Sequence, residues 1–173
     1  MKKLITLFTN LNILIAMAIR RLQSEYIQIQ KEPNYFYSVI PTESNFKKWE
    51  FILIGPPDTF FEGGIFEGYL KFPSEYPSRP PELRFTTELF HPNIYKDGKV
   101  CISILHEGVD QYGYESSVER WLPSHGVNSI MMSIVSMLGE PNFESPANID
   151  ASVMWKDNVK EYKKIIYKMI AKQ

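Results

Sequence analysis

Apolar residues recur at the spacing of a helix in three segments of the chain. The first segment begins near residue 18 and is stopped by Pro33, the second spans residues 127–138 and is closed by Gly139, and the third spans residues 159–169. Their apolar stripes are Ala18, Leu22, Tyr26 and Ile29, then Val127, Ile130, Met131, Ile134, Val135 and Leu138, and finally Val159, Tyr162, Ile165, Ile166 and Met169. We therefore expect three amphipathic helices, each with one face in the core.

Four runs rich in aromatic and β-branched residues lie between the first and second of these helices. They cover residues 35–40, 49–54, 65–72 and 82–86, and clusters of Pro, Gly, Asn and Asp separate them. No helix-length segment lies between them, so the pattern favours an antiparallel meander over a parallel sheet. Residues 90–126 show no clear period, and a loop of that length is usually functional or disordered. The order predicts an α+β fold: an N-terminal helix, a four-stranded antiparallel meander, an irregular segment that holds the candidate site, and C-terminal helices.

The first 16 residues have a different character. Lys2 and Lys3 precede a largely apolar run, which is typical of the start of a signal peptide. The run is short for a membrane span, and polar residues interrupt it. A leader, an anchor, an accessory extension and a mis-assigned start with Met17 as the working first residue all fit this pattern. We therefore divide the chain into an apolar extension, residues 1–16, and one globular domain, residues 17–173.

Composition narrows the classes of function without selecting one. The length of 173 residues fits a single domain. Nineteen Lys and Arg against 20 Asp and Glu leave no basic excess of the kind that binds nucleic acid. The single cysteine excludes an internal disulfide and a cluster of cysteine ligands for zinc, and it favours a reducing compartment such as the cytoplasm.

The candidate chemistry gathers around that cysteine, Cys101. A lone cysteine among apolar neighbours is most often a small buried hydrophobe. Here, however, the His-Pro-Asn sequence of residues 91–93 precedes it, and residues 96–99 have the composition of a tight turn between the two. Such a turn would fold one segment against the other and bring the side-chain amide of Asn93 near the sulfur.

Four motifs, taken together, resemble the ubiquitin-conjugating enzymes. They are Tyr76-Pro77-Ser78-Arg79-Pro80-Pro81, Phe90-His91-Pro92-Asn93-Ile94-Tyr95, Gly98-Lys99-Val100-Cys101-Ile102-Ser103-Ile104-Leu105, and Trp121 with Pro123. Their order and spacing are similar to those of the family from residue 18 to the C-terminus. Residues 106–117 resemble the extended acidic loop of the G-type branch, whose members are linked with protein quality control at the endoplasmic reticulum. The loop here is slightly shorter and carries fewer acids than is typical.

The resemblance implies the ubiquitin-conjugating fold for residues 17–173 and an acyl transfer in two steps. Cys101 would take ubiquitin from the activating enzyme as a thioester and then pass it to a lysine amine. The implied reaction needs no metal and no cofactor, because the activating enzyme consumes the ATP upstream. Asn93 would donate a hydrogen bond to the oxyanion of the second step. His91 would shape the turn that holds Asn93, with a role as general base as the alternative.

Further residues of the loop could act on the attacking lysine. A carboxylate can orient the amine or accept its proton, and burial beside the sulfur would lower the pKa of the amine. The candidates by position are Asp110, Glu115 and Glu119. His106, which follows the apolar run after Cys101, could act at the same place.

Partner surfaces follow from the resemblance alone. Arg20 and Arg21 match positions that meet the activating enzyme. A ligase, of the RING type, would contact two loops, one with Tyr76, Pro77 and Ser78 and one with Leu122, Pro123 and Ser124. Ser78 is a departure, because many members carry a larger apolar residue there. The resemblance implies quality control and proteasomal degradation in the cytoplasm, at the surface of the endoplasmic reticulum, with membrane association only through residues 1–16 or a partner.

Two other functions remain open at this point. A cysteine hydrolase could pair Cys101 with His91, His106 or His125, because three histidines make such a dyad available. A non-catalytic ubiquitin-binding scaffold is the other, although such relatives lack the cysteine.

Overall fold

The computed structural model describes residues 2–111, 113 and 115–173, with side chains described from residue 12 onward. The elements are α1 (Lys2–Lys31), β1 (Tyr37–Thr42), β2 (Asn45–Ile54), β3 (Ile65–Lys71), β4 (Glu82–Phe85), the short 3-10 helix η1 (Ser103–Leu105), α2 (Val127–Gly139), α3 (Ile149–Asp157) and α4 (Val159–Ile170). The predicted α+β order is confirmed.

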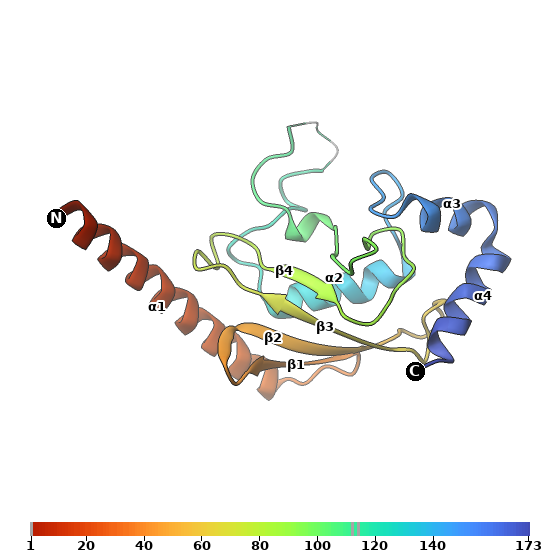
Figure 1. The fold of residues 1–173 in the computed structure, drawn as a ribbon, viewed down its shortest axis with the longest axis horizontal. Coiled ribbons are helices and arrows are strands. Elements are labelled where there is room, and N and C mark those ends of the chain that lie inside the picture. The colour runs from red at the N-terminus through yellow and green to blue at the C-terminus, as the bar shows by residue number, and fades with distance from the viewer. Residues whose placement is uncertain (1, 112, 114) are drawn as a thin grey trace.

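The four strands form one antiparallel sheet in the order β1-β2-β3-β4 (Figure 1). Alternate residues of β2 show its two faces: Phe51 and Leu53 are buried, whereas Ile52 and Ile54 are each 47% exposed. The buried face packs in one core with the apolar stripes of α1 and α2. Because apolar residues alternate in this way along the strands, one face of the sheet is covered and the other is open.

The structure extends or adds elements at three places. Strand β2 begins at Asn45, earlier than predicted, since residues 45–48 are mostly polar and gave no strand signal. Helix α3 was not predicted, because only Ala151 and Ser152 among its residues are buried and no apolar stripe results. Helix α1 begins at Lys2, so the apolar extension continues the predicted helix without a break, and its first half projects beyond the sheet (Figure 1).

No helix in the described part of the chain is both long and apolar enough to cross a membrane. The division at residue 17 and the role of residues 1–16 remain predictions.

The long irregular segment between β4 and α2 begins beside β4, the edge strand of the sheet, and carries the candidate site. Within it, Ile94 pairs with Val100 and Arg84 of β4 pairs with Lys99 in isolated bridges. These bridges fold residues 94–100 into a hairpin-like turn against β4, as the composition of residues 96–99 predicted. The turn delivers Cys101 to the surface immediately after the buried Val100.

Candidate active site

Cys101 emerges from the core at the end of this turn. Its backbone N–H donates to the carbonyl of Asn93 at 3.0 Å, which ties the cysteine to the His-Pro-Asn segment. Gly98 makes the turn possible, because its φ is +83° and a Cβ there would lie 2.1 Å from the carbonyl oxygen of Phe85. Cys101 itself is partly exposed. The backbone of Cys101 is therefore held in place, and the residue is partly accessible from solvent.

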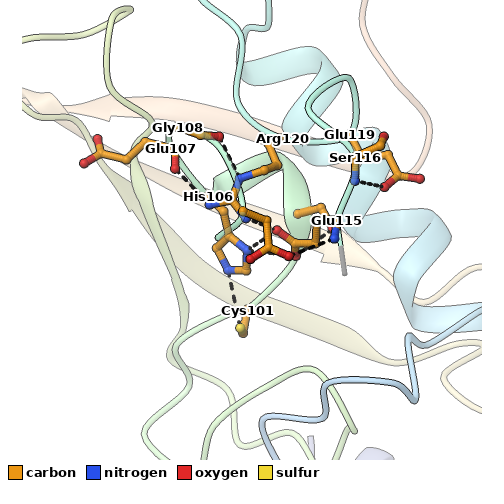
Figure 2. Close-up of polar contacts among 10 residues, drawn as sticks. Cys101, His106, Glu107, Gly108, Glu115, Ser116, Glu119 and Arg120 are labelled. Atoms are coloured by element: carbon orange, nitrogen blue, oxygen red, sulfur yellow. Dashed lines mark hydrogen bonds and ion pairs between the residues drawn. The ribbon is translucent and has the colours of Figure 1, made fainter. Parts of the chain in front are cut away.

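His106 faces the sulfur from the other side of η1. Its Nε2 lies 3.5 Å from the Sγ of Cys101 (Figure 2). The backbone N–H of His106 donates to the carbonyl of Ser103 at 2.8 Å, and its carbonyl accepts from the N–H of Trp121 at 2.9 Å. The chain thus turns through one short helix and is then anchored, which aims the imidazole back at the cysteine.

Glu115 holds the far side of the imidazole. Its carboxylate accepts from Nδ1 of His106 at 2.9 Å and from the hydroxyl of Ser103 at 2.9 Å, and it pairs with Arg120 (Figure 2). Only 17% of the Glu115 side chain is exposed. A carboxylate with three partners has one preferred orientation, so the imidazole that it binds is also oriented.

Arg120 closes the loop that carries these groups. Its Nε donates to the carbonyl of Gly108 at 2.9 Å and its Nη2 to the carbonyl of Glu107 at 2.8 Å, while Nη1 pairs with Glu115. Its side chain is 13% exposed. Asp110 accepts from the backbone N–H of Glu115 at 3.0 Å. Sequence reasoning named Asp110 and Glu115 but missed Arg120, whose planar group joins both ends of the loop.

The electrostatics of the site favour a charged sulfur. The hydrogen bond from His106 lowers the pKa of the Cys101 thiol, against the opposing effect of burial. The same bond raises the pKa of His106, with further support from Glu115. Burial alone would raise the pKa of Glu115, but hydrogen bonds from His106 and Ser103 outweigh it and lower the value. The arrangement therefore stabilises a thiolate beside an imidazolium, which is the reactive form of a cysteine.

Tyr95 is a second neighbour of the sulfur that sequence reasoning missed. A hydrogen bond from its hydroxyl contributes to the lowered pKa of Cys101, and the nearby sulfur in turn raises the pKa of Tyr95. Its backbone N–H donates to the carbonyl of Lys99 at 2.9 Å, within the turn before the cysteine. The predicted turn was the available signal. A turn over residues 96–99 brings Tyr95, the residue before the turn, close to Cys101, which lies two residues after the turn.

His91 and Asn93 lie in a different environment. His91 is fully buried, its Nδ1 accepts from the N–H of Asn93 at 3.0 Å, and its Nε2 contacts the carbonyl of Met137 at 3.0 Å. Burial lowers the pKa of His91 to about 3, so its ring is neutral at physiological pH. Both ring nitrogens are engaged with the backbone, as a turn-shaping role requires, and the ring nitrogen that faces Cys101 belongs to His106 instead.

The side chain of Asn93 is also held. It donates to the carbonyl of Asn142 at 2.7 Å and accepts from the N–H of the same residue at 2.8 Å. An amide nitrogen carries two N–H groups, so the contact with Asn142 orients the group and leaves the second N–H for another acceptor. Asn93 and Cys101 line a shared cavity of about 70 Å³, together with His106 and Glu115.

Cys101 also lines a second cavity. It has a volume of about 390 Å³ and is lined by Arg79, Tyr95, Cys101, Leu105 and Glu107, among others. The Nε of Arg79 lies 2.8 Å from a carboxylate oxygen of Glu107. Cys101 thus lies between two groups of cavity-lining residues, one with Asn93 and Glu115 and one with Arg79 and Glu107.

Glu119 lies apart from this cluster. It is exposed, and its carboxylate accepts from the N–H of Ser116 at 3.0 Å. His125 accepts at Nδ1 from the N–H of Leu122 at 3.2 Å. Within the part of the chain that the structure describes, no three His, Cys, Asp or Glu side chains gather in a way that could hold a metal ion.

The two loops expected to contact a ligase meet through Trp121. Its indole Nε1 donates to the carbonyl of Pro77 at 2.8 Å, and its ring lies 5.9 Å from that of Tyr76. Ser78 is exposed, and so are Leu122, Pro123 and Ser124. Tyr76 differs from the expectation, because its side chain is 2% exposed and its hydroxyl donates to Glu25 at 2.6 Å. It supports this surface from within and does not offer its side chain to a partner.

The two arginines of α1 also differ from each other. Arg20 is exposed. Arg21 donates to the carbonyls of Pro123 and His125, at 3.3 and 3.0 Å, and lies 2.5 Å from Glu25. Its guanidinium therefore links α1 to the loop before α2, in addition to any contact with a partner.

Comparison with known proteins identifies chains of similar sequence. The family model described as "Ubiquitin-conjugating enzyme" matches residues 21–170. The chain is 52% identical to the human protein named ubiquitin-conjugating enzyme E2 G2 over 157 residues, which are 90% of this chain and 95% of the relative. It is 48% identical over 153 residues to ubiquitin-conjugating enzyme E2 7 of Arabidopsis thaliana, covering 87% and 92% of the two chains. It is 47% identical over 151 residues to ubiquitin-conjugating enzyme E2 15 of Schizosaccharomyces pombe, covering 86% and 90%.

Proposed function

Because the chain belongs to the ubiquitin-conjugating enzyme family, we propose that Cys101 is the residue that carries ubiquitin as a thioester. The observation that supports this assignment is the contact between its half-buried sulfur and His106, at 3.5 Å. A thiolate is the nucleophile in thioester exchange, and a neighbouring imidazolium increases its fraction at neutral pH. Cys101 is also the single cysteine of the chain.

Charging follows directly from this arrangement. The thiolate of Cys101 attacks the thioester carbonyl of ubiquitin on the activating enzyme, the new C–S bond forms, and the thiolate of the activating enzyme leaves. Ubiquitin, the activating enzyme and a ligase are the partners that membership of the family implies. In the second step a lysine amine attacks, and Cys101 leaves as a thiolate.

Asn93 is proposed as the oxyanion donor of that second step. Its amide is oriented by Asn142 on the wall of the cavity that Cys101 also lines. A donor that is already oriented stabilises developing negative charge without reorganisation, an effect on the order of 3 kcal/mol at comparable sites. His106 is proposed to act at the reacting atoms, Glu115 to orient its ring, Asp110 to position Glu115, and His91 to hold the turn.

The finer biological role is also a proposal. The similarity of residues 106–117 to the extended loop of the G-type branch supports quality control and proteasomal degradation, in the cytoplasm and at the surface of the endoplasmic reticulum. The joined surface of residues 76–79 and 122–124 supports docking of a RING-type ligase, and the exposed Arg20 supports contact with the activating enzyme.

The experiment that tests the assignment is charging with purified activating enzyme, ATP and ubiquitin. Wild type is expected to form an adduct that a thiol reagent cleaves, that requires ATP, and that Cys101→Ala abolishes. A hydrolase would need no ATP and would release ubiquitin, and a scaffold would form no adduct. A thiol-labile adduct that persists in Cys101→Ala would overturn the proposal.

A further inference from the structure

The side chains around Cys101 form the three-part arrangement of an acyl-transfer site with a general base. The nucleophilic sulfur lies beside Nε2 of His106, and Nδ1 of the same ring is bound by Glu115 at 2.9 and 3.0 Å (Figure 2). The same spatial order of nucleophile, base and oriented carboxylate occurs on unrelated folds. There the base removes a proton from a weak nucleophile and the carboxylate orients the base. Transfer to lysine does not by itself require all three parts.

Amine and hydroxyl acceptors place different demands on the enzyme. A neutral amine attacks a thioester through its lone pair and can lose its proton afterwards. A hydroxyl group is a weak nucleophile unless a base removes its proton as it attacks. A base held beside the thioester therefore increases the rate for hydroxyl acceptors more than the rate for amines.

We propose that this site has a second acceptor activity, in which ubiquitin passes from Cys101 to the hydroxyl group of serine, threonine or a small polyol, with His106 as the general base and Glu115 as its positioning residue. The proposal rests on the proposed function of Cys101 as the thioester residue. It adds a class of acceptor and a role for the imidazole at that same site.

The proposed transfer to a hydroxyl group passes through a tetrahedral intermediate. The hydroxyl oxygen attacks the thioester carbonyl carbon while Nε2 of His106 takes the hydroxyl proton, and a tetrahedral oxyanion forms. The oxyanion collapses, the C–S bond breaks, and ubiquitin is released as an oxyester of the acceptor. Cys101 leaves as a thiolate beside the protonated imidazole.

Charging itself prepares the base. The largest contribution to the raised pKa of His106 in the free enzyme is its hydrogen bond with Cys101. A thioester sulfur carries no charge, so this contribution is lost when ubiquitin is attached and the proton can leave the ring. Burial then favours the neutral imidazole, whereas Glu115, itself paired with Arg120, still holds Nδ1 and keeps Nε2 directed at the thioester. Tyr95 is the other titratable group that faces the sulfur, and its raised pKa keeps it protonated.

The surroundings of the sulfur admit a small acceptor. The cavity that Cys101 shares with His106, Glu115 and Asn93 has a volume of about 70 Å³, and the second cavity that Cys101 and His106 line has a volume of about 390 Å³. Part of one cavity wall is polar, from Ser103 and Asn142. A hydroxyl group can thus come within reach of both the thioester and the base.

The experiment measures transfer from the thioester to an acceptor separately from formation of the thioester. Wild type, His106→Gln, Glu115→Gln and the matched control Glu119→Gln are charged, and ATP and activating enzyme are then removed. Each thioester is chased in a buffer free of amines and hydroxyls with glycerol, with N-acetylthreonine, or with Nα-acetyllysine. Intact mass spectrometry measures ubiquitin joined to each acceptor, and hydroxylamine cleaves an oxyester but not an amide.

We expect wild type and Glu119→Gln to form hydroxylamine-labile adducts with glycerol and N-acetylthreonine at equal rates. In His106→Gln the rate of ester formation should fall on the order of 100-fold, and the rate with Nα-acetyllysine by less than about tenfold. Glu115→Gln should lose about tenfold in ester formation, because the ring keeps its base but loses its orientation. The wild-type ester rate should rise with pH through one ionisation, and that rise should be absent in His106→Gln.

Two results would overturn the inference. One is a wild-type enzyme that charges fully, transfers to Nα-acetyllysine and forms no ester. The other is an equal loss of ester and amide formation in His106→Gln, which would assign the histidine a purely structural role. Failure of wild type to charge would instead overturn the proposed function of Cys101, so the two failures are distinguishable.

Discussion

The histidines on the two sides of Cys101 occupy opposite environments. His91 is fully buried, bonds to backbone groups through both ring nitrogens and packs against the rings of Phe61 and Trp155. His106 has a side chain that is 33% exposed, and its ring bonds to the side chains of Cys101 and Glu115. Burial lowers the pKa of the first, whereas charged neighbours raise the pKa of the second.

The difference in environment gives the two histidine segments different roles, one structural and one chemical. Backbone partners cannot titrate, so the segment of His91 and Asn93 keeps one structure across the physiological pH range. Side-chain partners can titrate, so His106 and Glu115 can change their protonation when the sulfur of Cys101 passes from a thiolate to an uncharged thioester. The same residue type thus supports the fold on one side of Cys101 and the reaction on the other.

The largest expected effect is on stability. His91→Gln should lower the free energy of unfolding by about 2–4 kcal/mol, because ring packing is lost and buried backbone groups lose their partners. His106→Gln, at a partly exposed position, should cost less than about 1 kcal/mol. Urea denaturation of both variants measures the difference. Equal losses would show that the two environments do not differ energetically.

The next effect is on discharge. Asn93→Ala should charge with ubiquitin but transfer it to lysine on the order of 100-fold more slowly, because the oxyanion donor is missing. Single-turnover chase with free lysine measures this rate. Asn93→Asp is the matched control: it keeps an acceptor for the N–H of Asn142 but lacks the amide donor, so it should also charge and discharge slowly. An equal loss of charging in a folded Asn93→Ala would contradict the oxyanion assignment.

A smaller effect is expected from the arginine that closes the loop. Arg120→Ala should destabilise the protein by about 1–2 kcal/mol, because a largely buried guanidinium is removed from Glu115 and two carbonyls. Arg79→Ala, whose side chain is 54% exposed, should leave stability nearly unchanged, because a pair of exposed charges contributes little. Thermal unfolding of the pair tests the prediction, and a larger loss in Arg79→Ala would reverse the assignment.

The smallest expected effect is a shift in a pH profile. Alkylation of the single cysteine by iodoacetamide reports its thiolate. Because His106 lowers the pKa of Cys101 while burial and Glu115 raise it, removal of His106 leaves only the hydrogen bond from Tyr95 to oppose burial. The midpoint of the alkylation rate should therefore lie at higher pH in His106→Gln than in wild type. An unchanged midpoint would show that the imidazole does not stabilise the thiolate.

The fold was largely readable from the sequence, for a physical reason. The strands and the helices α2 and α4 bury one face each, so their apolar residues carry the period of the element. Helix α3 buries little and was missed, although Asn148 at its start, whose side chain accepts from the N–H of Ala151 at 3.1 Å, has the composition of an N-cap. The start of α1 was also missed, because a change in composition near residue 17 was not a change in backbone structure.

Most residues of the site could be predicted from the sequence, but the hydrogen bonds and ion pairs between their side chains could not. Cys101, Asn93, His106 and Glu115 were named from motifs and position. Their pairing depends on the path of the chain between residues 101 and 120, which has no period to read and is fixed by contacts distant in sequence, such as Trp121 to Pro77. Arg120 was missed for the same reason, whereas Tyr95 was missed although the predicted turn of residues 96–99 was a signal for it. Polar side chains in a loop gain partners only when the loop is closed.

Trp121 also provides a fluorescent probe of the closed loop. Its indole N–H is bonded at the joined surface of residues 76–79 and 122–124, while its backbone N–H is bonded to His106, next to the sulfur. The other two tryptophans lie elsewhere, Trp49 in the sheet and Trp155 in α3. In a chain in which those two are replaced by phenylalanine, the tryptophan emission would come from Trp121 alone, so a change in it would report on this loop.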